Sequence, residues 1–178
     1  MVAEKLLVKN LKNGQEDAYN KIVSEYGNRL LRTCYLILKD REEAEDVVQE
    51  TFIRIFQKMD TFREKSGLYT WIYTIALNLS RDRLRKKQDT LILEDEWVGN
   101  NEVEYQVEKN FDRDLLRKEL YHLNSLYREV LVLFYFEELS IKEISNLLNE
   151  KEGTIKSKLS RGRRILKESL LKGGQLNG

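Results

Sequence analysis

Apolar residues recur with a helical period in three segments of the first half of the chain. From Ala44 to Met59 they stand at positions 44, 47, 48, 52, 55, 56 and 59. This spacing follows the 3.6-residue repeat of an amphipathic helix and does not fit the alternation of a strand. Similar spacing predicts helices over Ile22–Leu38 and Leu68–Lys87. We expect these helices to form an N-terminal bundle, with an exposed polar loop, Thr61–Gly67, before the last of them.

The same period returns in the second half of the chain, in four shorter segments. They are Leu115–Leu123, Leu126–Phe136, Ile141–Leu148 and Thr154–Leu171. Ser140 is placed to cap the third segment, with Glu143 in the capping-box position, and Thr154 is placed to cap the fourth. A short turn containing Gly153 separates these two. This is the layout of a helix-turn-helix, whose second helix enters the major groove of DNA.

The last predicted helix has two chemically different faces. The side expected to face the core carries Ile155, Leu159, Gly162, Leu166 and Leu170. The opposite side presents long cations and small hydroxyls, the groups that contact phosphates and base edges. The residues predicted to contact DNA are Thr154, Lys156, Ser157, Lys158, Ser160, Arg161 and Arg164. A merely solvated basic helix gives the same pattern, so this helix alone does not decide the function.

Charge is segregated along the chain, although the net charge is only +1. Residues 88–112 hold eight acidic residues and one basic residue, whereas residues 151–172 hold eight basic and two acidic residues. A second basic cluster spans Arg81–Lys87. Two basic segments separated by an acidic connector suggest two anchoring points for a polyanion. The predicted fold is therefore all-α, with helical domains at 1–87 and 113–178 joined by a flexible acidic linker at 88–112.

Composition excludes several classes of protein. The chain has no proline and one cysteine, Cys34, so it is neither a proline-rich spacer nor an intramolecular disulfide scaffold. Its longest apolar run, Val130–Phe136, is far shorter than the ~20 residues that span a bilayer. The N-terminus lacks the continuous apolar stretch of an export signal. We therefore expect a cytoplasmic protein without direct membrane insertion.

Three segments, taken in order, resemble a known family. They are Asp40–Phe52 (DREEAEDVVQETF), Thr70–Asn78 (TWIYTIALN) and Gly153–Leu159 (GTIKSKL). Together they are similar to the signature segments of the extracytoplasmic function (group IV) sigma factors of bacterial RNA polymerase. The resemblance covers about Glu16 to Leu171. It implies a promoter-specificity subunit that binds core RNA polymerase, reads the minus-thirty-five element with the last helix and melts the minus-ten element.

The resemblance assigns further surfaces. Glu45, Asp46, Gln49 and Glu50 match the surface that docks on the clamp helices of the largest polymerase subunit, although such an acidic run is usually only a solvated face. The minus-ten region matches Phe62 to Lys87, where an extruded base needs a pocket, edge contacts and cations for its phosphates. The residues assigned there are Phe62, Leu68, Tyr69, Thr74, Asn78, Arg81, Arg83, Arg85 and Lys86. Leu68 and Tyr69 are expected to wall the pocket, whereas Trp71 is expected in the core.

Three positions depart from the family pattern. Thr74 stands where many members carry Arg, and Leu68 stands where Phe is frequent, so the minus-ten preference of other members does not transfer directly. Asn124 replaces the Pro that commonly begins the last domain, which removes a marker of a helix start but no functional group.

The resemblance also implies partners. They are core RNA polymerase, promoter DNA and a dedicated anti-sigma factor, with no cofactor, metal or catalytic residue. The acidic connector is expected to thread through the polymerase near the RNA path, although a solvated tether is an equally good interpretation of its sequence.

Two other classes compete with this interpretation. A stand-alone dimeric helix-turn-helix regulator would use the same last helix, but it leaves the aromatic segment near Phe62–Tyr73 and the second basic cluster unexplained. A helical di-metal enzyme is suggested by Glu119–His122, but that architecture needs two Glu-x-x-His segments and His122 is the only histidine.

Overall fold

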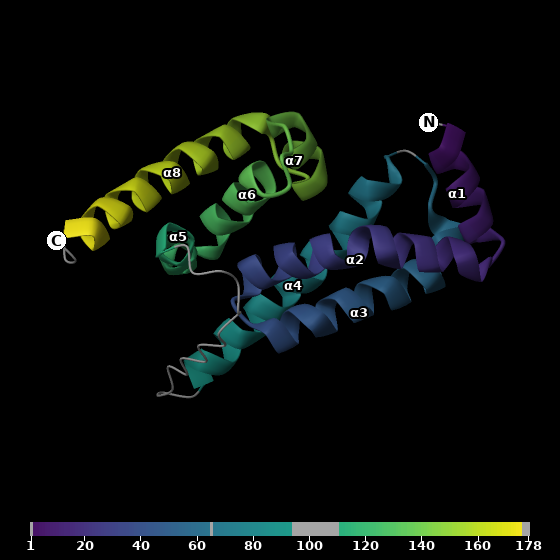
Figure 1. Ribbon diagram of the computed structural model, residues 1–178, viewed down its shortest axis with the longest axis horizontal. Coiled ribbons are helices and arrows are strands. Elements are labelled where there is room, and N and C mark those ends of the chain that lie inside the picture. Colours follow the sequence, from purple (N-terminus) through teal and green to yellow (C-terminus); the bar gives the residue numbers. More distant parts are fainter. Residues whose placement is uncertain (1, 65, 94–110, 176–178) are drawn as a thin grey trace. The chain divides into compact units, whose positions relative to one another are not determined.

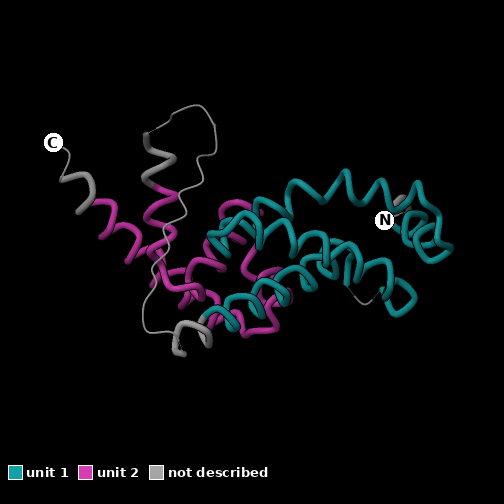
Figure 2. The backbone as a smooth tube through the Cα atoms, turned by 90° about the horizontal axis from the view of Figure 1, so that it is seen from below, with its two compact units in different colours: residues 1–99 teal, residues 100–178 magenta. Residues whose placement is uncertain are grey.

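The computed structural model describes residues 2–64, 66–93 and 111–175. The chain divides into two compact units, residues 1–99 and 100–178 (Figure 2). Within the described ranges the regular secondary structure is entirely helical, as predicted. None of the helices in those ranges combines the length and the hydropathy that crossing a bilayer requires.

Over its described residues, 2–64 and 66–93, unit 1 contains four α-helices and one short 3₁₀-helix (Figure 1). They are α1 (Val2–Lys12), α2 (Glu16–Leu38), α3 (Arg41–Lys58), η1 (Met59–Thr61) and α4 (Leu68–Leu93). Helices α2, α3 and α4 pack on one another along their lengths, and α1 packs on α2 and η1 at one end. Ile22, Leu30, Ile55 and Ile72, all fully buried, fill the core between the three long helices. The predicted N-terminal bundle is confirmed.

The junction between α2 and α3 explains where those helices stop and start. Helix α2 ends at Leu38, because the φ of 65° at Lys39 takes the backbone out of the helical region. The side chain of Asp40 then accepts a hydrogen bond from the N–H of Glu43 at 3.2 Å and caps α3. Two acids in the first turn of α3, Glu42 and Glu43, favour the same start because that helix end carries partial positive charge.

Unit 1 departs from the sequence-based expectation at several points. Helix α1 was not predicted, and α4 continues past Lys87 to Leu93, into the segment assigned to the linker. The loop before α4 is not exposed throughout, because Phe62 is only 4% exposed. Phe56 was placed on the apolar face of α3, yet its side chain is 65% exposed.

The part of unit 2 that the structure describes, residues 111–175, is a bundle of four helices: α5 (Phe111–His122), α6 (Ser125–Tyr135), α7 (Ile141–Leu148) and α8 (Glu152–Gln175). Helix α8 contacts each of the other three, and its buried Ile155 joins Val130, Leu133 and Ile144 in the core. These four helices match the four predicted segments. Residues 94–110, which make up most of the predicted acidic linker, lie outside the described residues.

A buried cation joins α5 to α6. Arg128 is only 2% exposed, and its guanidinium donates hydrogen bonds to the carbonyls of Leu123 at 2.8 Å and Tyr121 at 3.4 Å. Burial lowers the pKa of Arg128 to about 10, against the opposing influence of Tyr121 and Glu129. The guanidinium therefore remains charged at neutral pH and satisfies carbonyls at the end of α5 that the helix leaves without partners.

The turn between α7 and α8 confirms one predicted cap and corrects the other. Ser140 and Glu143 form the expected capping box at the start of α7. Helix α8 begins at Glu152, however, so Thr154 lies inside its first turn and is not its cap. The N–H groups of Thr154 and Ile155 both donate to the carbonyl of Lys151, at 2.9 and 3.1 Å, which shows that helical bonding has already begun before Thr154.

Candidate DNA-binding and docking surfaces

Helix α8 presents the predicted polar face to solvent. Ile155 and Leu159 are 0% and 2% exposed and hold the opposite face against the core. Behind the polar face, a Cβ on Gly162 would lie 3.1 Å from Cδ1 of Leu131, so α6 and α8 approach closely at this glycine. The side chains exposed on α8 include Thr154, Lys156, Ser157, Ser160, Arg161 and Arg164. Hydroxyls and long cations on one exposed helix face match the chemistry of base edges and phosphates.

Lys158 differs from its predicted neighbours. Its ammonium lies 2.7 and 2.6 Å from the two carboxylate oxygens of Glu150, and its side chain is only 16% exposed. Glu150 belongs to the turn before α8, where its carbonyl accepts a hydrogen bond from Ser145 Oγ. In this conformation Lys158 braces the helix-turn-helix turn and does not project toward solvent as the other predicted cations do.

A groove of about 450 Å³ lies beside the polar face of α8. It is lined by Leu126, Tyr127, Gly153, Thr154, Ser157, Lys158 and Arg161. Leu126 is 52% exposed, although it is the first apolar residue of the predicted segment Leu126–Phe136. Asn124, just before α6, accepts the N–H of Leu126 at 2.9 Å through its side chain and so caps this helix. It stands where Pro commonly begins the last domain in the family. A residue in the first turn of a capped helix is more readily left at the surface than one in its middle.

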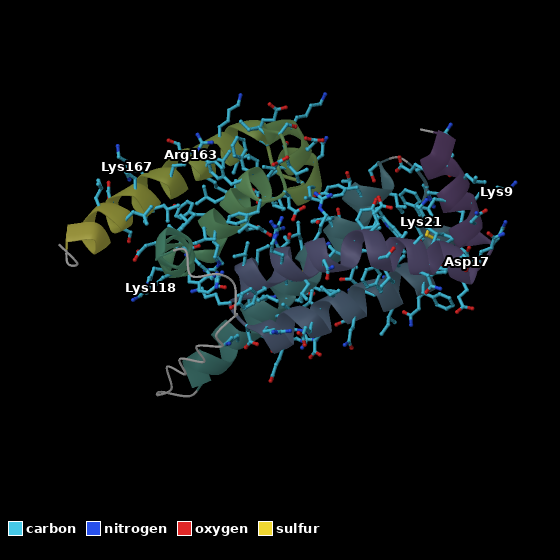
Figure 3. The ribbon with its side chains drawn as sticks, viewed as in Figure 1. Lys9, Asp17, Lys21, Lys118, Arg163 and Lys167 are labelled. Atoms are coloured by element: carbon cyan, nitrogen blue, oxygen red, sulfur yellow. The ribbon has the colours of Figure 1, made fainter. Side chains whose placement is uncertain are left out.

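The cations of α8 do not all point the same way. Arg163 lies over the rings of Phe134 and Tyr135, 5.0 and 5.4 Å from their centroids. Figure 3 labels Arg163 and Lys167, which lie one turn apart on the helix. The guanidinium of Arg163 is thus held by the aromatic end of α6, which agrees with its absence from the predicted DNA contacts.

The predicted minus-ten region is only partly exposed. Phe62 and Leu68 are 4% and 1% exposed, so Leu68, which was expected to wall a base pocket, is buried in this structure. Both side chains are needed to close the core where the loop meets α4. Tyr69 is half-buried and stacks on Tyr73 at 4.2 Å between ring centroids, with the guanidinium of Arg29 at 5.6 Å. Trp71 was expected in the core but is half-buried, 5.0 Å from the Phe62 ring.

Further along α4 the polar residues face solvent or neighbouring acids. Asn78 is exposed, and the hydroxyl of Thr74 donates to the carbonyl of Thr70 at 2.7 Å. Arg83 lies 3.4 Å from both Glu43 and Glu50 of α3. Arg85 and Lys86 are exposed, Arg81 is half-buried, and Arg85 pairs with Asp82. The basic end of α4 is therefore engaged with carboxylates in this structure.

The predicted docking acids lie together on α3. Asp46 and Gln49 are exposed, Glu45 pairs with Arg41 at 2.7 Å, and Glu50 pairs with Arg54 at 2.6 Å. Two apolar residues continue the Asp46–Gln49 face along the helix, because positions three and four residues apart are neighbours. They are Ile53 and Phe56, which are 55% and 65% exposed. Sequence reasoning missed this surface because it placed Phe56 on the apolar, core-facing side of the helix and gave Ile53 no role.

Comparison with known proteins identifies the family. Residues 22–90 match Sigma-70 region 2, and residues 113–166 match Sigma-70, region 4. The chain is 35% identical over 176 residues to the ECF RNA polymerase sigma factor SigW of Bacillus subtilis, covering 92% of this chain and 94% of SigW. The chain belongs to the ECF sigma factors. The ECF sigma factor SigM of B. subtilis is 31% identical over 83% of this chain and 92% of its own length.

Two solved structures resemble this sigma factor. The sigma factor RpoE of Bartonella quintana, in complex with the anti-sigma factor NepR, is 26% identical with a TM-score of 0.75, over 86% of this chain and 96% of that one. CnrH, in complex with the cytosolic domain of CnrY, shares the fold with a TM-score of 0.71 and 22% identity, over 96% of this chain and 98% of that one.

Membership in this family establishes the general activity. This sigma factor directs promoter-specific transcription initiation by RNA polymerase, with core enzyme and promoter DNA as its partners. The predicted recognition as an extracytoplasmic function sigma factor is thereby confirmed. Which residues carry each contact is a separate question.

Proposed function

We propose that α8 reads the minus-thirty-five element and that the loop before α4, together with α4, captures and opens the minus-ten element. The observation that carries this assignment is the division of α8 into a buried apolar face and an exposed face of hydroxyls and cations. Lys156, Ser157, Ser160 and Arg161 are the side chains best placed for direct readout. Lys158 has a bracing role in this scheme, because Glu150 already holds its ammonium.

The minus-ten assignment rests on fewer exposed groups than the sequence suggested. Asn78 presents an amide to solvent, and Tyr69 offers a partly exposed ring on which an unstacked base can pack. The cations of the Arg81–Lys86 segment supply contacts to the phosphates of the opened strand. Phe62 and Leu68, both buried, support this surface from beneath. Opening needs no chemical energy source, because contacts to the extruded bases and to the polymerase offset the few kcal/mol that unstacking costs.

Docking on core polymerase is assigned to one face of α3, defined by Asp46, Gln49, Ile53 and Phe56. Exposed apolar side chains beside carboxylates are typical of a protein interface whose centre is apolar and whose rim is polar. Glu45 and Glu50 flank this docking face and engage Arg41 and Arg54. The exposed aromatic ring of Phe56 is the feature that a solvated acidic face would not need.

We also propose a cytoplasmic location and a dedicated anti-sigma partner. The support for the partner is the related sigma factor of B. quintana, which is similar over most of this chain and was solved in complex with an anti-sigma factor. The functional division into residues 1–87, 88–112 and 113–178 remains our working assignment, with the acidic segment as a tether or as a path through the polymerase.

Reconstitution with core polymerase tests the proposal. Sequencing the start sites of the transcripts defines the promoter elements, and single substitutions on α8 and α4 then assign each element to its surface. Substitutions on α8 should alter the minus-thirty-five preference only, and Asn78→Ala should alter the minus-ten preference only. A dimeric regulator, in contrast, would footprint a two-fold site without polymerase.

A further inference from the structure

The residue just before helix α4 has no side chain with which to cap it. The carbonyl of Gly67 accepts the N–H of Trp71 at 3.2 Å, which places Gly67 at the N-cap position. Glycine has no side chain, so it cannot accept one of the free N–H groups of the first turn as Ser, Thr or Asp would. It also leaves the chain before the helix with more conformational freedom than any other residue would.

The missing acceptor comes from a distant part of the sequence. Oε1 of Glu4, in α1, accepts the N–H of Leu68 at 2.7 Å across 64 positions of sequence. A carboxylate at this place is favoured twice, because a charge-assisted hydrogen bond is stronger than a neutral one and because the helix N-terminus carries partial positive charge. Glu4 therefore does for α4 what Asp40 does locally for α3.

A second contact ties α1 to the same loop. The ammonium of Lys12 lies 3.8 Å from Glu64. Between the two polar contacts, Val8 and Leu11 of α1 are 2% and 1% exposed and Phe62 is 4% exposed. A small cavity of about 230 Å³ remains between α1 and the loop, lined by Glu4, Lys5, Val8, Phe62, Glu64, Ser66 and Gly67. Helix α1 and the loop thus form one packed structure at the start of α4.

We infer that Glu4 is a positioning residue for recognition of the minus-ten element. This inference rests on the proposed role of the loop and α4 in capturing an extruded base. Such capture requires the loop and Asn78, which lies further along α4, to be held in a fixed relation. Because Gly67 does not stiffen their junction, the bond from Glu4 supplies the constraint from outside. Loss of that bond lets the loop shift against the helix and weakens the distinction between correct and incorrect bases.

The experiment compares Glu4→Ala and Glu4→Gln with the wild-type protein in reconstituted holoenzyme. Transcription is measured from one promoter and from variants substituted singly at each minus-ten and minus-thirty-five base. Glu4→Ala should reduce discrimination among minus-ten variants about fivefold, within the range that loss of a cap produces. Glu4→Gln keeps an acceptor oxygen and should restore most of the discrimination. Core-polymerase affinity and minus-thirty-five discrimination should not change.

Two controls keep the outcomes separate. Lys9→Ala alters an exposed residue of the same helix, labelled in Figure 3, and should leave all ratios unchanged. Asn78→Ala reports on the proposed function itself. If Asn78→Ala changes minus-ten discrimination and both Glu4 variants leave it intact, the positioning role is wrong and the proposed function stands. If Asn78→Ala has no effect on minus-ten discrimination, the proposed minus-ten role of α4 is wrong, and the inference about Glu4 that rests on it is wrong as well.

A purely structural role for Glu4 gives a different result. In that case Glu4→Ala lowers transcription from every promoter by the same factor, in step with its thermal stability, and the ratios between promoters do not move. That result would overturn the inference. Glu4→Gln provides the test if the alanine variant fails to fold, because it must then preserve discrimination to support the role of the acceptor oxygen.

Discussion

The two basic surfaces of the molecule keep their cations in different states. On α8, Lys156 and Arg161 are exposed and make no ion pair within the described part of the chain. On α4, Arg83 lies between Glu43 and Glu50, and Lys87 lies 3.6 Å from Asp40. A cation of α8 can approach a phosphate directly, whereas Arg83 must first leave two carboxylates. We therefore expect the cations of the two surfaces to contribute unequally to DNA binding.

The largest effect is expected on α8. Lys156→Ala combined with Arg161→Ala should reduce promoter use by holoenzyme about a hundredfold, because each lost base or phosphate contact costs ~1–3 kcal/mol. Run-off transcription over a series of salt concentrations measures this, and the salt dependence should also become weaker. The matched control is Lys142→Ala, an exposed lysine on α7 outside the proposed reading face. Unchanged transcription by the double variant would show that this face of α8 does not contact promoter DNA.

The next effect separates docking from DNA binding. Phe56→Ala should weaken binding to core polymerase about thirtyfold, which is typical when an aromatic anchor is removed from the centre of an interface. Titration of labelled core enzyme measures the affinity without DNA. Gln57→Ala, at the exposed neighbouring position, serves as the control. If both variants bind equally well, the apolar part of the docking face has no role.

A smaller effect is expected on α4. Arg83→Gln should reduce promoter use only about threefold, since contacts to DNA are partly offset by the two ion pairs that Arg83 gives up, each worth ~0–1 kcal/mol at a surface. Arg161→Gln, measured in parallel, should lose more promoter use, and its salt dependence should become weaker than that of Arg83→Gln. Equal losses for Arg83 and Arg161 would contradict the contrast between the two surfaces.

The smallest effect concerns the cap of α7. Hydrogen bonds from the hydroxyl and the N–H of Ser140 hold the pKa of Glu143 below its ordinary value of 4.5. The carboxylate therefore stabilises unit 2 above that pH, and this contribution is lost as the pH falls through the lowered value of the folded protein. Glu143→Gln should remove this acid dependence at a cost under about 1 kcal/mol. Thermal unfolding followed between about pH 3 and pH 6 checks the prediction; an unaltered acid dependence would contradict it.

The helices were predictable because their apolar period is strong and local. The bounds of α7 agree with the prediction residue for residue, and those of α6 differ by one position at each end. Helix α1 was not predicted. It packs on α2, which follows it directly, and on η1, which is distant in sequence, so its own pattern does not show this second contact. The contact of Glu4 could not be predicted for the same reason. No sequence pattern in α1 shows that the Glu4 carboxylate accepts a hydrogen bond from the N–H of Leu68.

The types of residue in the candidate sites were predictable from the sequence, but which of their side chains are exposed was not. Residue type marked the exposed polar face of α8, since an amphipathic helix has only one core-facing side. Residue type did not show that Phe62 and Leu68 are buried, or that Phe56 is not. Nor did it show that Lys158 is engaged by Glu150. Exposure and pairing depend on neighbouring elements, so these assignments required the structure.

Gly162 has a consequence for how new specificities can arise. Because a Cβ at this position would lie 3.1 Å from Cδ1 of Leu131 and 3.3 Å from Cβ of Tyr127, the approach of α8 to α6 is set from behind, by a hydrogen atom where other residues carry a carbon. The outward side chains can then be exchanged one at a time without rotating the scaffold that presents them. Selection for altered promoters should therefore enrich changes along the solvent side and leave this single position untouched.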